Sequence, residues 1–435
     1  MQKVIYFLIN NLKYIIIFYI LIQLVYIIFF PAPYKSDSLY YYQLSLSSLN
    51  HGTVYPSYYN INENYIIAPL FINLESLILS IYNSVFSIRI LHLVLNLLQL
   101  YILYYITKKH YGKKVSKVFV LLYIFYLPNI GFVQLNMTEL FFGVLLSLCI
   151  YSLFKETKTG YLFSGIFAAA SLSARPTGWA LLASLLIYII SIKSEIKFQI
   201  ISWIFTGAIL FFIVFGITTQ LSSDHFVVTS VNYGTNFLIG ANDDATGAYN
   251  DRVFQQDKAG FINAPESKTY IYKQHLWFFH AVNWVKENPV KWVKLIPLKF
   301  IHIFVWDDYA VSPLLGMQDW NLYVLMKHLL IIKDSEKLMS NVPFFVKIAY
   351  IFLQIFHHIY YFTIMIVFLL VVIKNFKTLI KNNLFKLFLL IILISLVIPL
   401  FSFGDARFKY PYILMIMILI SPFVNNYFNK IKLIS

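Results

Sequence analysis

Residues 14–30 read YIIIFYILIQLVYIIFF, an apolar run that follows Lys13 and ends at Pro31. A transmembrane α-helix needs about 20 predominantly apolar residues, within a range of roughly 17 to 25. The run therefore predicts a helix that crosses a membrane. No small-residue cleavage site follows it, only FFPAP at residues 29–33, so we expect an uncleaved first span rather than a signal peptide that is removed.

The composition extends this prediction to the whole chain of 435 residues. Hydrophobic residues make up 60% and charged residues only 12%, whereas a soluble domain carries about 25% charged residues. A membrane must therefore cover much of the chain. We attribute the net charge of +15 to lysines retained on the cytoplasmic side. No basic stretch is long or soluble enough to indicate nucleic-acid binding. The single cysteine, Cys149, excludes an intramolecular disulfide.

Further apolar runs complete the prediction of an all-α polytopic fold with about ten transmembrane helices. The shorter runs 161–174 and 177–192 are expected to form a hairpin around a Pro-Thr-Gly break. The stretches 66–86 and 292–306 carry prolines and polar residues, which suit helices lying in the interface. The alternative is that 292–306 pairs with 320–332 as a second crossing. The ten predicted spans are 14–30, 89–106, 118–135, 138–154, 161–174, 177–192, 198–217, 344–373, 387–403 and 411–428.

Lysine clusters predict the orientation, because lysines are retained on the cytoplasmic side. With these clusters and the N-terminus inside, the ten spans alternate correctly and the C-terminus is inside. The segments 31–88, 218–343 and 404–410 then face outside. The chain divides into an N-terminal transmembrane module (1–217), an outer loop region (218–343) and C-terminal transmembrane helices (344–435). The clusters are Lys108, Lys109, Lys113, Lys114 and Lys117; Lys155 and Lys158; Lys193 and Lys197; Lys374, Lys377, Lys381 and Lys386; and Lys430 and Lys432.

The arginines follow a different distribution from the lysines. The chain has only four, Arg89, Arg175, Arg252 and Arg407, and in the predicted topology all of them fall at or beyond the outer edge. Arginine presents a planar fork of donors that matches phosphate and carboxylate. The sequence therefore indicates an anion site formed by Arg175 and Arg407 above all. Chance placement of a few arginines in a lysine-biased sequence is the alternative.

Two acidic residues are candidates for chemistry. Asp37 lies in YKSDSLYYYQ (34–43), directly after the first span, where a carboxylate could act as general base toward an acceptor hydroxyl. The alternative is a helix cap, since Asp or Ser before a helical run satisfies free backbone N–H groups. Glu139 begins a span in Thr-Glu-Leu. It could contact a sugar or the arginines, or only favour the helix N-terminus.

The outer loops hold two further polar motifs. Residues 242–249, NDDATGAY, resemble a calcium loop, but the twelfth position is valine, so the EF-hand prediction fails. Asp243, Asp244 and Tyr249 then either touch sugar hydroxyls or belong to a solvated turn. In the late loop GDARFKYP, Arg407 and Lys409 could hold the phosphate of a lipid. Their alternative role is as snorkelling anchors in an aromatic belt. The histidines form no metal-ligand pattern.

These motifs, in this order, resemble the GT-C superfamily of membrane glycosyltransferases, in particular protein O-mannosyltransferases and lipid A aminoarabinose transferases. The resemblance extends along nearly the whole chain. Each motif is short, so the order of the motifs is its main support. It is carried by Asp37 before a tyrosine-rich helix, APL at 68–70 before an interfacial helix, Arg89 opening the next span, TEL at 138–140, ARP at 174–176, GANDDATGAY at 240–249, AVNWVKENP at 281–289 and GDARFKYP at 404–411.

The resemblance implies a GT-C-like fold and an inverting transfer from a polyprenyl-phosphate sugar. The acceptor would be a lipid, a glycan or a protein, at the outer face of a membrane, by this resemblance the bacterial inner membrane. By match to the family, Asp37 is the base or acceptor-positioning carboxylate. Arg175, Arg407 and Lys409 are candidates for the departing lipid phosphate. Glu139, Asp243, Asp244, Tyr249 and Arg89 are possible contacts to acceptor or sugar.

The chain departs from the family at two acidic positions. Many relatives carry Asp-Glu in the first loop, but here Ser38 follows Asp37. Some relatives have an acidic residue before the Pro-Pro-Leu motif, but here Ile66 and Ile67 occupy that place and Glu63 lies earlier. These departures make a divalent-metal site doubtful, and no other cofactor is implied.

Two other functions compete with this prediction. An O-antigen or capsule polymerase is also polytopic with large outer loops, but its loops are rich in arginine. A lipid-linked sugar flippase or transporter would carry charged residues within its spans, whereas here the spans are nearly free of charge. We therefore rank the polymerase second and the non-enzymatic transporter third.

Overall fold

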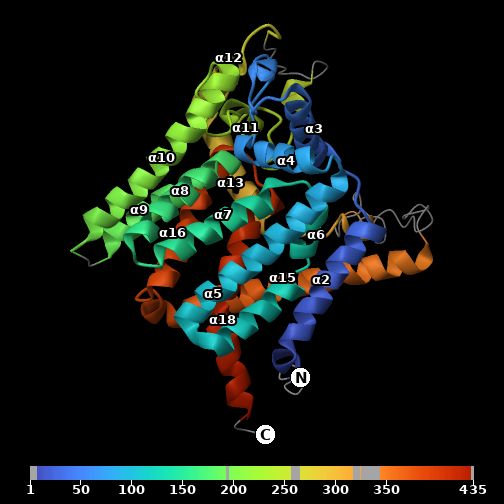
Figure 1. The fold of residues 1–435 in the computed structure, drawn as a ribbon, viewed down its shortest axis with the longest axis vertical. Coiled ribbons are helices and arrows are strands. Elements are labelled where there is room, and N and C mark those ends of the chain that lie inside the picture. Colours follow the sequence, from blue (N-terminus) through green and yellow to red (C-terminus); the bar gives the residue numbers. More distant parts are fainter. Residues whose placement is uncertain (1–6, 193–194, 256–264, 317–323, 325–342, 433–435) are drawn as a thin grey trace.

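The computed structural model describes residues 7–192, 195–255, 265–316, 324 and 343–432. This part of the chain consists of helices joined by loops, with two isolated β-bridges and no β-strand. The predicted all-α class is confirmed. The N- and C-terminal ends lie together at one end of the molecule, opposite helices α3, α4, α11 and α12 (Figure 1).

Six helices among the described residues are long and apolar enough to cross a membrane. Their outward faces carry large hydrophobic side chains, such as Ile209 on α10 and Phe352 on α15, that a soluble protein would bury. The protein is therefore a multi-pass helical membrane protein. The six are α2 (Leu12–Phe29), α5 (Val85–Phe125), α10 (Lys197–Ser223), α15 (Phe344–Leu379), the stretch Asn383–Phe401 that contains α16 (Asn383–Ser395) and α17 (Val397–Phe401), and the stretch Ala406–Tyr427 that begins α18 (Tyr410–Lys432).

Helices shorter than these six account for the rest of the predicted spans. A pair of helices bent by 119° at a short break counts as a seventh span if it is taken as one. The predicted spans 89–106 and 118–135 share the long helix α5, which is interrupted at Gly112, where φ is 84°. The predicted hairpin 161–174 and 177–192 corresponds to two consecutive helices. The bent pair is α6 (Pro128–Gln134) with α7 (Thr138–Leu153), and the hairpin is α8 (Lys158–Ala174) with α9 (Gly178–Ser191).

Close packing of α8 against α10 forms one side of the bundle. A Cβ atom on Gly165 would lie 1.9 Å from the carbonyl oxygen of Ile204, and one on Gly207 would lie 2.0 Å from that of Leu162. Glycine on both helices therefore lets the two backbones touch, a packing mode that membrane helices favour because it gains dispersion contacts without hydrophobic driving force. The contact also holds the C-terminal end of α8 in place, where Arg175 follows.

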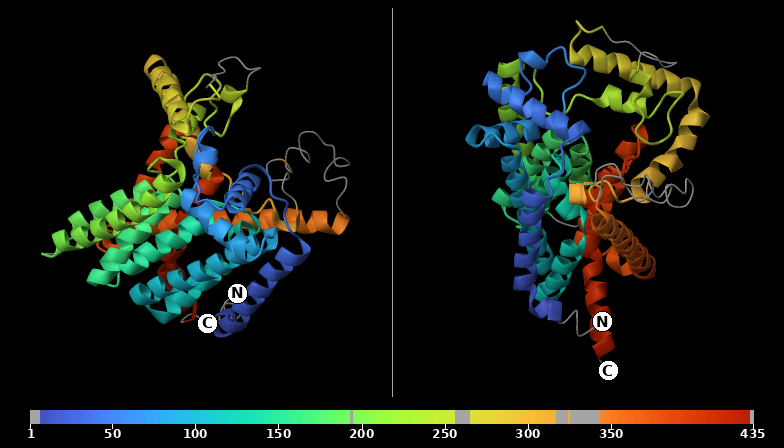
Figure 2. Two further views of the ribbon diagram at one scale, coloured as in Figure 1. Left: turned by 45° about the horizontal axis from the view of Figure 1, so that its top comes forward. Right: turned by 90° about the vertical axis from the view of Figure 1, so that its right-hand side faces the viewer.

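The remaining helices gather at one end of the bundle (Figure 1). Two of them, α12 and α13, meet at a sharp angle after Asn288 and extend away from the bundle as an arm (Figure 2). Two β-bridges tie loops together at this end, Ile66 with Val231 and Ala248 with Gly404. The helices are α3 (Ser36–His51), α4 (Pro69–Ile81), α11 (Tyr233–Ile239), α12 (Tyr270–Glu287) and α13 (Pro289–Phe304).

The two stretches predicted to lie in the interface are short helices, α4 and α13, but their polar residues are arranged differently from the expectation. Glu75, a polar residue of the first stretch, is fully buried. Lys299 is also buried. Its ammonium donates to the carbonyls of Gly240 and Leu400, at 3.3 and 2.7 Å, so its donors are satisfied within the protein. The alternative crossing at 320–332 lies outside the described residues except for Val324.

Candidate active site

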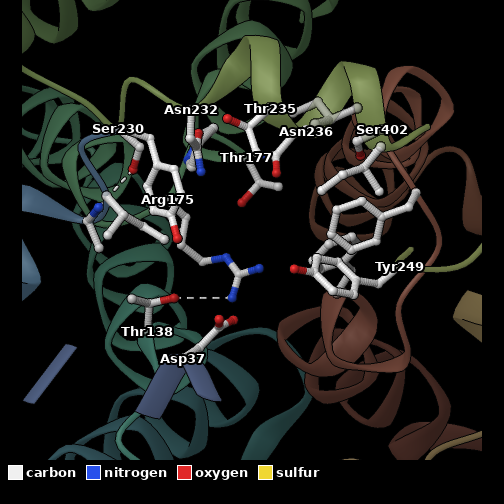
Figure 3. Close-up of a pocket in the computed structure, with 18 of the residues that line it drawn as sticks. Asp37, Thr138, Arg175, Thr177, Ser230, Asn232, Thr235, Asn236, Tyr249 and Ser402 are labelled. Atoms are coloured by element: carbon white, nitrogen blue, oxygen red, sulfur yellow. Dashed lines mark hydrogen bonds between the residues drawn. The ribbon is translucent and has the colours of Figure 1, made fainter. Parts of the chain in front are cut away.

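A cavity of about 430 Å³ lies where several helix ends meet. Its lining comes from the start of α3, the start of α7, the break between α8 and α9, helix α11 and the turn at 402–408. At a helix end the chain changes direction and some backbone groups are left without helical partners. Side chains from segments that are distant in sequence can therefore point into the same cavity. Figure 3 shows Arg175 in the middle of this space, with Asp37 on one side of it and Tyr249 on another.

The local sequence explains why Arg175 points inward. A residue before proline is restricted to extended backbone, and Arg175 has φ −152° and ψ 140° as the C-cap of α8. Pro176 therefore ends the helix and turns the arginine side chain out of the helical path. Across the cavity, Ser36 and Ala68 adopt positive φ, 47° and 45°. Non-glycine residues rarely occupy this region, and such strain gathers at functional sites.

Arg407 connects three carboxylates at the floor of the cavity. Its Nη1 lies 2.6 Å from Oδ2 of Asp37, and its Nε lies 3.3 Å from Oδ2 of Asp405 and 3.8 Å from Oε1 of Glu139. Its side chain is 13% exposed. The Asp37 carboxylate therefore turns to Arg407, and no side chain caps α3, which counts against the helix-cap alternative.

Arg175 forms the second ion pair of the floor. Its Nη1 pairs with Oε1 of Glu139 and donates to the hydroxyl of Thr138 at 3.3 Å. Glu139 is almost fully buried, and its Oε2 has no hydrogen-bond partner among the described residues. The carboxylate thus links the two arginines, which is one of the roles the sequence left open for it.

Aromatic rings hold both guanidinium groups. The Phe408 ring lies between them, 5.6 Å from Arg175 and 5.8 Å from Arg407. The Tyr309 ring lies 5.4 Å from Arg407, and its hydroxyl accepts a hydrogen bond from Nη1 at 3.4 Å. Burial raises the pKa of Tyr309 above its ordinary value of 10.0, which keeps its hydroxyl protonated. Both guanidinium groups therefore lie within cation–π distance of an aromatic ring, a contact that arginine makes more often than lysine.

The structure brings five of the predicted site residues together. Asp37, Glu139, Arg175, Arg407 and Tyr249 all line the cavity, although they come from five separate segments of the chain. The two loops that carry Tyr249 and Arg407 are joined directly, since the amide of Gly404 donates to the carbonyl of Gly247 at 2.7 Å.

Lys409, predicted as a phosphate ligand, does not line the cavity. Its side chain is buried, and its Nζ lies 3.0 Å from Oδ1 of Asp307 and donates to the backbone carbonyls of Ile303 at 2.8 Å and of Trp306. Although burial raises it, Lys409 and His357 bring the pKa of Asp307 below its ordinary value of 3.8. The ammonium is therefore occupied within the protein, and the adjacent Arg407 faces the other way, into the cavity.

Three other predicted contacts also lie away from the cavity lining. Arg89 is buried at the start of α5, where it donates to the carbonyl of Ala32 and packs 5.3 Å from the Tyr34 ring. Asp243 is 79% exposed and pairs with Lys291 at 3.6 Å. Asp244 is exposed in the same solvated turn. Arg89 thus anchors the chain after the first span, and the two aspartates match the turn alternative.

The sequence did not single out Asp405, Tyr309 or the cavity asparagines. Asp405 stands two residues before Arg407, where its carboxylate both pairs with the guanidinium and accepts from the backbone amide of Arg407 at 3.0 Å. The Asp-x-Arg spacing was a usable signal for it. Nothing in the sequence distinguishes Asn232 and Asn236 from the other asparagines of this chain, because neutral amides are common in loops.

A buried carboxylate behind the cavity was missed as well. Oε2 of Glu75 accepts from Ser45 at 2.8 Å and from Asn136 at 3.2 Å, and Asn136 also donates to the carbonyl of Ser38 at 3.3 Å. Burial raises the pKa of Glu75 from 4.5 to about 8. Glu75 thereby joins α4 to the segments that carry Asp37 and Glu139.

Among the described residues, no three His, Cys, Asp or Glu side chains are placed to hold a metal ion together. The carboxylates at the floor are each directed at an arginine instead. No known protein family, curated protein or solved structure matches this chain. The function of this protein is therefore inferred from the geometry of the cavity.

Proposed function

We propose that this protein is a membrane glycosyltransferase that moves a sugar from a polyprenyl-phosphate donor to an acceptor. We further propose a GT-C-like fold of ten transmembrane helices, in which α8 and α9 form a hairpin. The cavity would open at the outer face of the bacterial inner membrane. Helices α3 and α11, which contribute residues to the cavity, lie at the end of the molecule opposite the two termini (Figure 1). With the termini in the cytoplasm, this arrangement supports an outward-facing cavity.

The contact between Asp37 and Arg407 carries the proposal. The two residues stand 370 positions apart in the chain, yet their side chains meet at 2.6 Å on the floor of the cavity. A transferase of this type needs a carboxylate beside the acceptor hydroxyl and a cation beside the leaving phosphate. Both groups are present here, beside a membrane-spanning bundle that could hold the lipid chain.

The reaction can be written with these residues. The acceptor hydroxyl gives its proton to Asp37, and its oxygen forms a bond to the anomeric carbon of the donor sugar. The bond from that carbon to the phosphate oxygen breaks, and the electron pair leaves with the polyprenyl phosphate. The departing phosphate gains negative charge in this step, so donors fixed on Arg175 and Arg407 lower the barrier. The configuration at the anomeric carbon inverts.

The charge of the cavity favours a donor with a single negative charge. Among the described residues, four carboxyl side chains line the cavity, Asp37, Glu139, Asp251 and Glu266, against the two arginines Arg175 and Arg407. A phosphodiester-linked sugar carries one charge, whereas a lipid diphosphate carries at least two. Excess carboxylates repel the second charge. This balance supports a monophosphate donor and ranks the polymerase, which uses lipid diphosphates, behind the transferase.

The decisive experiment compares Asp37→Asn with the unmodified protein in nanodiscs. Each is incubated with a panel of polyprenyl-phosphate sugars and a membrane-lipid extract, and the release of free polyprenyl phosphate is followed. We expect release from at least one donor, and a loss of roughly 100-fold or more in Asp37→Asn, because general-base catalysis contributes about 10²–10⁴-fold.

The matched control is Asp243→Asn, which makes the same chemical change at an exposed carboxylate outside the cavity. It should retain full release. If folded protein releases nothing from any donor, or if Asp37→Asn releases lipid as fast as the control, the assigned site is wrong and the polymerase becomes the leading function.

A further inference from the structure

The side of the cavity opposite Asp37 is polar but uncharged. Figure 3 shows Thr177, Asn232 and Asn236 along this side, above the Arg175 guanidinium. All three line the cavity. Within the part of the chain that the structure describes, none of their side chains makes a hydrogen bond, and all are at least partly shielded from solvent. We call these three residues the amide wall.

The amide wall is held in a fixed position from behind. Gln274 of α12 is fully buried; its Nε2 donates to the Thr235 hydroxyl at 2.7 Å and to the Asn64 carbonyl at 2.9 Å. Its Oε1 accepts from the Thr235 amide at 3.0 Å. A Cβ on Gly234 would lie 2.0 Å from the Gln274 carbonyl oxygen, so glycine allows α11 to pack directly on α12. The unpaired amides are therefore presented on a rigid support.

Unpaired amides in a shielded cavity indicate a ligand with both donors and acceptors. A carboxamide offers two N–H donors and one carbonyl acceptor, and a ligand that displaces the surrounding water must replace the hydrogen bonds of these groups. Sugar hydroxyls both donate and accept. Two tyrosine rings, Tyr65 and Tyr249, line the same cavity and offer flat apolar faces for a sugar ring.

The charge of the cavity lining further restricts which ligands can bind. Among the described lining residues, the only cations are the two arginines at the floor, and four carboxyl side chains outnumber them in the same lining. Asp251 and Glu266 add two exposed carboxyl side chains to the lining. A sugar that carries a carboxylate would find no cation at the amide wall and would be repelled by these groups.

We propose that the amide wall is a subsite for an uncharged sugar ring, and that it excludes uronic acids. The sugar is either the unit transferred from the donor or the glycan that accepts it. That last assignment rests on the proposed transferase function, whereas the binding of an uncharged sugar does not.

The first test measures binding without any reaction. The full chain in nanodiscs is titrated with neutral trisaccharides of glucose, galactose and mannose, and with trigalacturonic acid, by saturation-transfer difference NMR. We expect at least one neutral trisaccharide to receive saturation and trigalacturonic acid to receive none. The double variant Asn232→Ala/Asn236→Ala should bind that trisaccharide at least roughly tenfold more weakly, because it loses one or two neutral hydrogen bonds to the sugar.

The control is Asn62→Ala, an exposed asparagine outside the cavity, which should bind as the unmodified protein does. Thermal unfolding checks that each variant is folded. The proposal is overturned if no neutral trisaccharide binds, if trigalacturonic acid binds equally well, or if the folded double variant keeps full affinity. The comparison of neutral and acidic sugars on the unmodified protein decides the charge preference without any variant.

The second test distinguishes the two sources of the sugar. Release of polyprenyl phosphate is measured with increasing donor at saturating neutral trisaccharide, which reports the KM of the donor, and then with increasing neutral trisaccharide at saturating donor, which reports the KM of the acceptor. A raised acceptor KM alone in the double variant assigns the wall to the acceptor, and a raised donor KM assigns it to the donor sugar. If no lipid is released at all, the transferase function fails while the binding result stands.

Discussion

The guanidinium of Arg175 reaches the middle of the cavity with most of its donors still available. Only its Nη1 makes contacts within the described part of the chain, with Glu139 and Thr138. Nε and Nη2 remain for a ligand, in the fixed fork that matches two phosphate oxygens. Lysine carries the same charge as a point on a flexible stem, and cannot reproduce the fork or the stacking on Phe408.

We therefore predict that Arg175→Lys weakens catalysis while keeping the charge. A charge-assisted hydrogen bond contributes about 1.5–3 kcal/mol, so kcat/KM for release of polyprenyl phosphate should fall roughly 10- to 100-fold. The control is Arg252→Lys, an exposed arginine outside the cavity, which should be unchanged. Equal kinetics in the two variants would show that Arg175 does not contact the donor.

Residue type alone did not separate Arg407 from Lys409. Both are cations of one short turn, and the sequence predicted both as phosphate ligands. In a 3₁₀ turn, residues two apart point in different directions. Arg407 faces Asp37 in the cavity, whereas Lys409 faces Asp307 in the interior. The orientation of the turn therefore decides which of the two side chains lines the cavity.

At the scale of elements, Glu75 couples the helices that carry the site. Through Ser45, Asn136 and the carbonyl of Ser38, this carboxyl of α4 contacts both α3 and the segment before α7. Because Asp37 and Glu139 stand in the first turns of α3 and α7, the network fixes the separation of the two carboxylates. The periodicity of α4 predicted a helix but not which face was buried, since the stretch is apolar on most sides.

The raised pKa of Glu75 predicts how stability changes with pH. Between its ordinary value of 4.5 and about 8, the folded protein keeps a proton that the unfolded chain has lost. The contribution of Glu75 to the free energy of unfolding is therefore complete below pH 4.5 and is lost as the pH rises through about 8. We expect the midpoint of thermal unfolding in detergent to decrease from pH 5 to pH 9, and Glu75→Gln to remove most of that decrease.

The control for this experiment is Glu63→Gln, which changes an exposed carboxyl of the same loop region. It should keep the pH dependence of the unmodified protein. The glutamine at position 75 resembles the protonated acid in shape, so it can preserve the bonds to Ser45 and Asn136. Identical pH dependence in Glu75→Gln and the unmodified protein would show that Glu75 is ionised in the folded state.

At the scale of the whole molecule, helices α3 and α11, which contribute residues to the cavity, lie at the end of the bundle opposite the chain ends (Figure 1). The lysine-rich turn around Gly112, where α5 is interrupted, belongs to the end with the termini. The proposed topology, with the termini in the cytoplasm, places this lysine-rich turn inside, as the positive-inside rule expects.

Cysteine labelling tests this orientation directly. The one native cysteine, Cys149, is fully buried, so the background should be low. In intact cells, a membrane-impermeant maleimide should label Asn62→Cys, near the cavity, and should label Lys114→Cys only after the membrane is permeabilised. Labelling of both positions from the same side, or in the reverse order, would contradict the proposed topology.

The sequence by itself determined the class of the protein and the residues from which a site could be built. Long apolar runs cannot be solvated as loops or surfaces, so they predict membrane helices wherever they occur. The sequence did not determine the count of spans, because the predicted span 118–135 is divided between α5 and α6. The rarity of arginine, and the positions of two carboxylates beside span ends, also pointed to Asp37, Glu139, Arg175 and Arg407 before any geometry was known.

Only the tertiary structure decided which of these residues meet. The Asp37–Arg407 contact joins positions 370 residues apart, and no local pattern encodes a separation of that length. The same holds for the amide wall, whose asparagines differ from others in the chain only by where α11 packs. The burial of Glu75, Lys299 and Lys409 is likewise set by neighbours distant in sequence, because desolvation depends on everything that surrounds a charge.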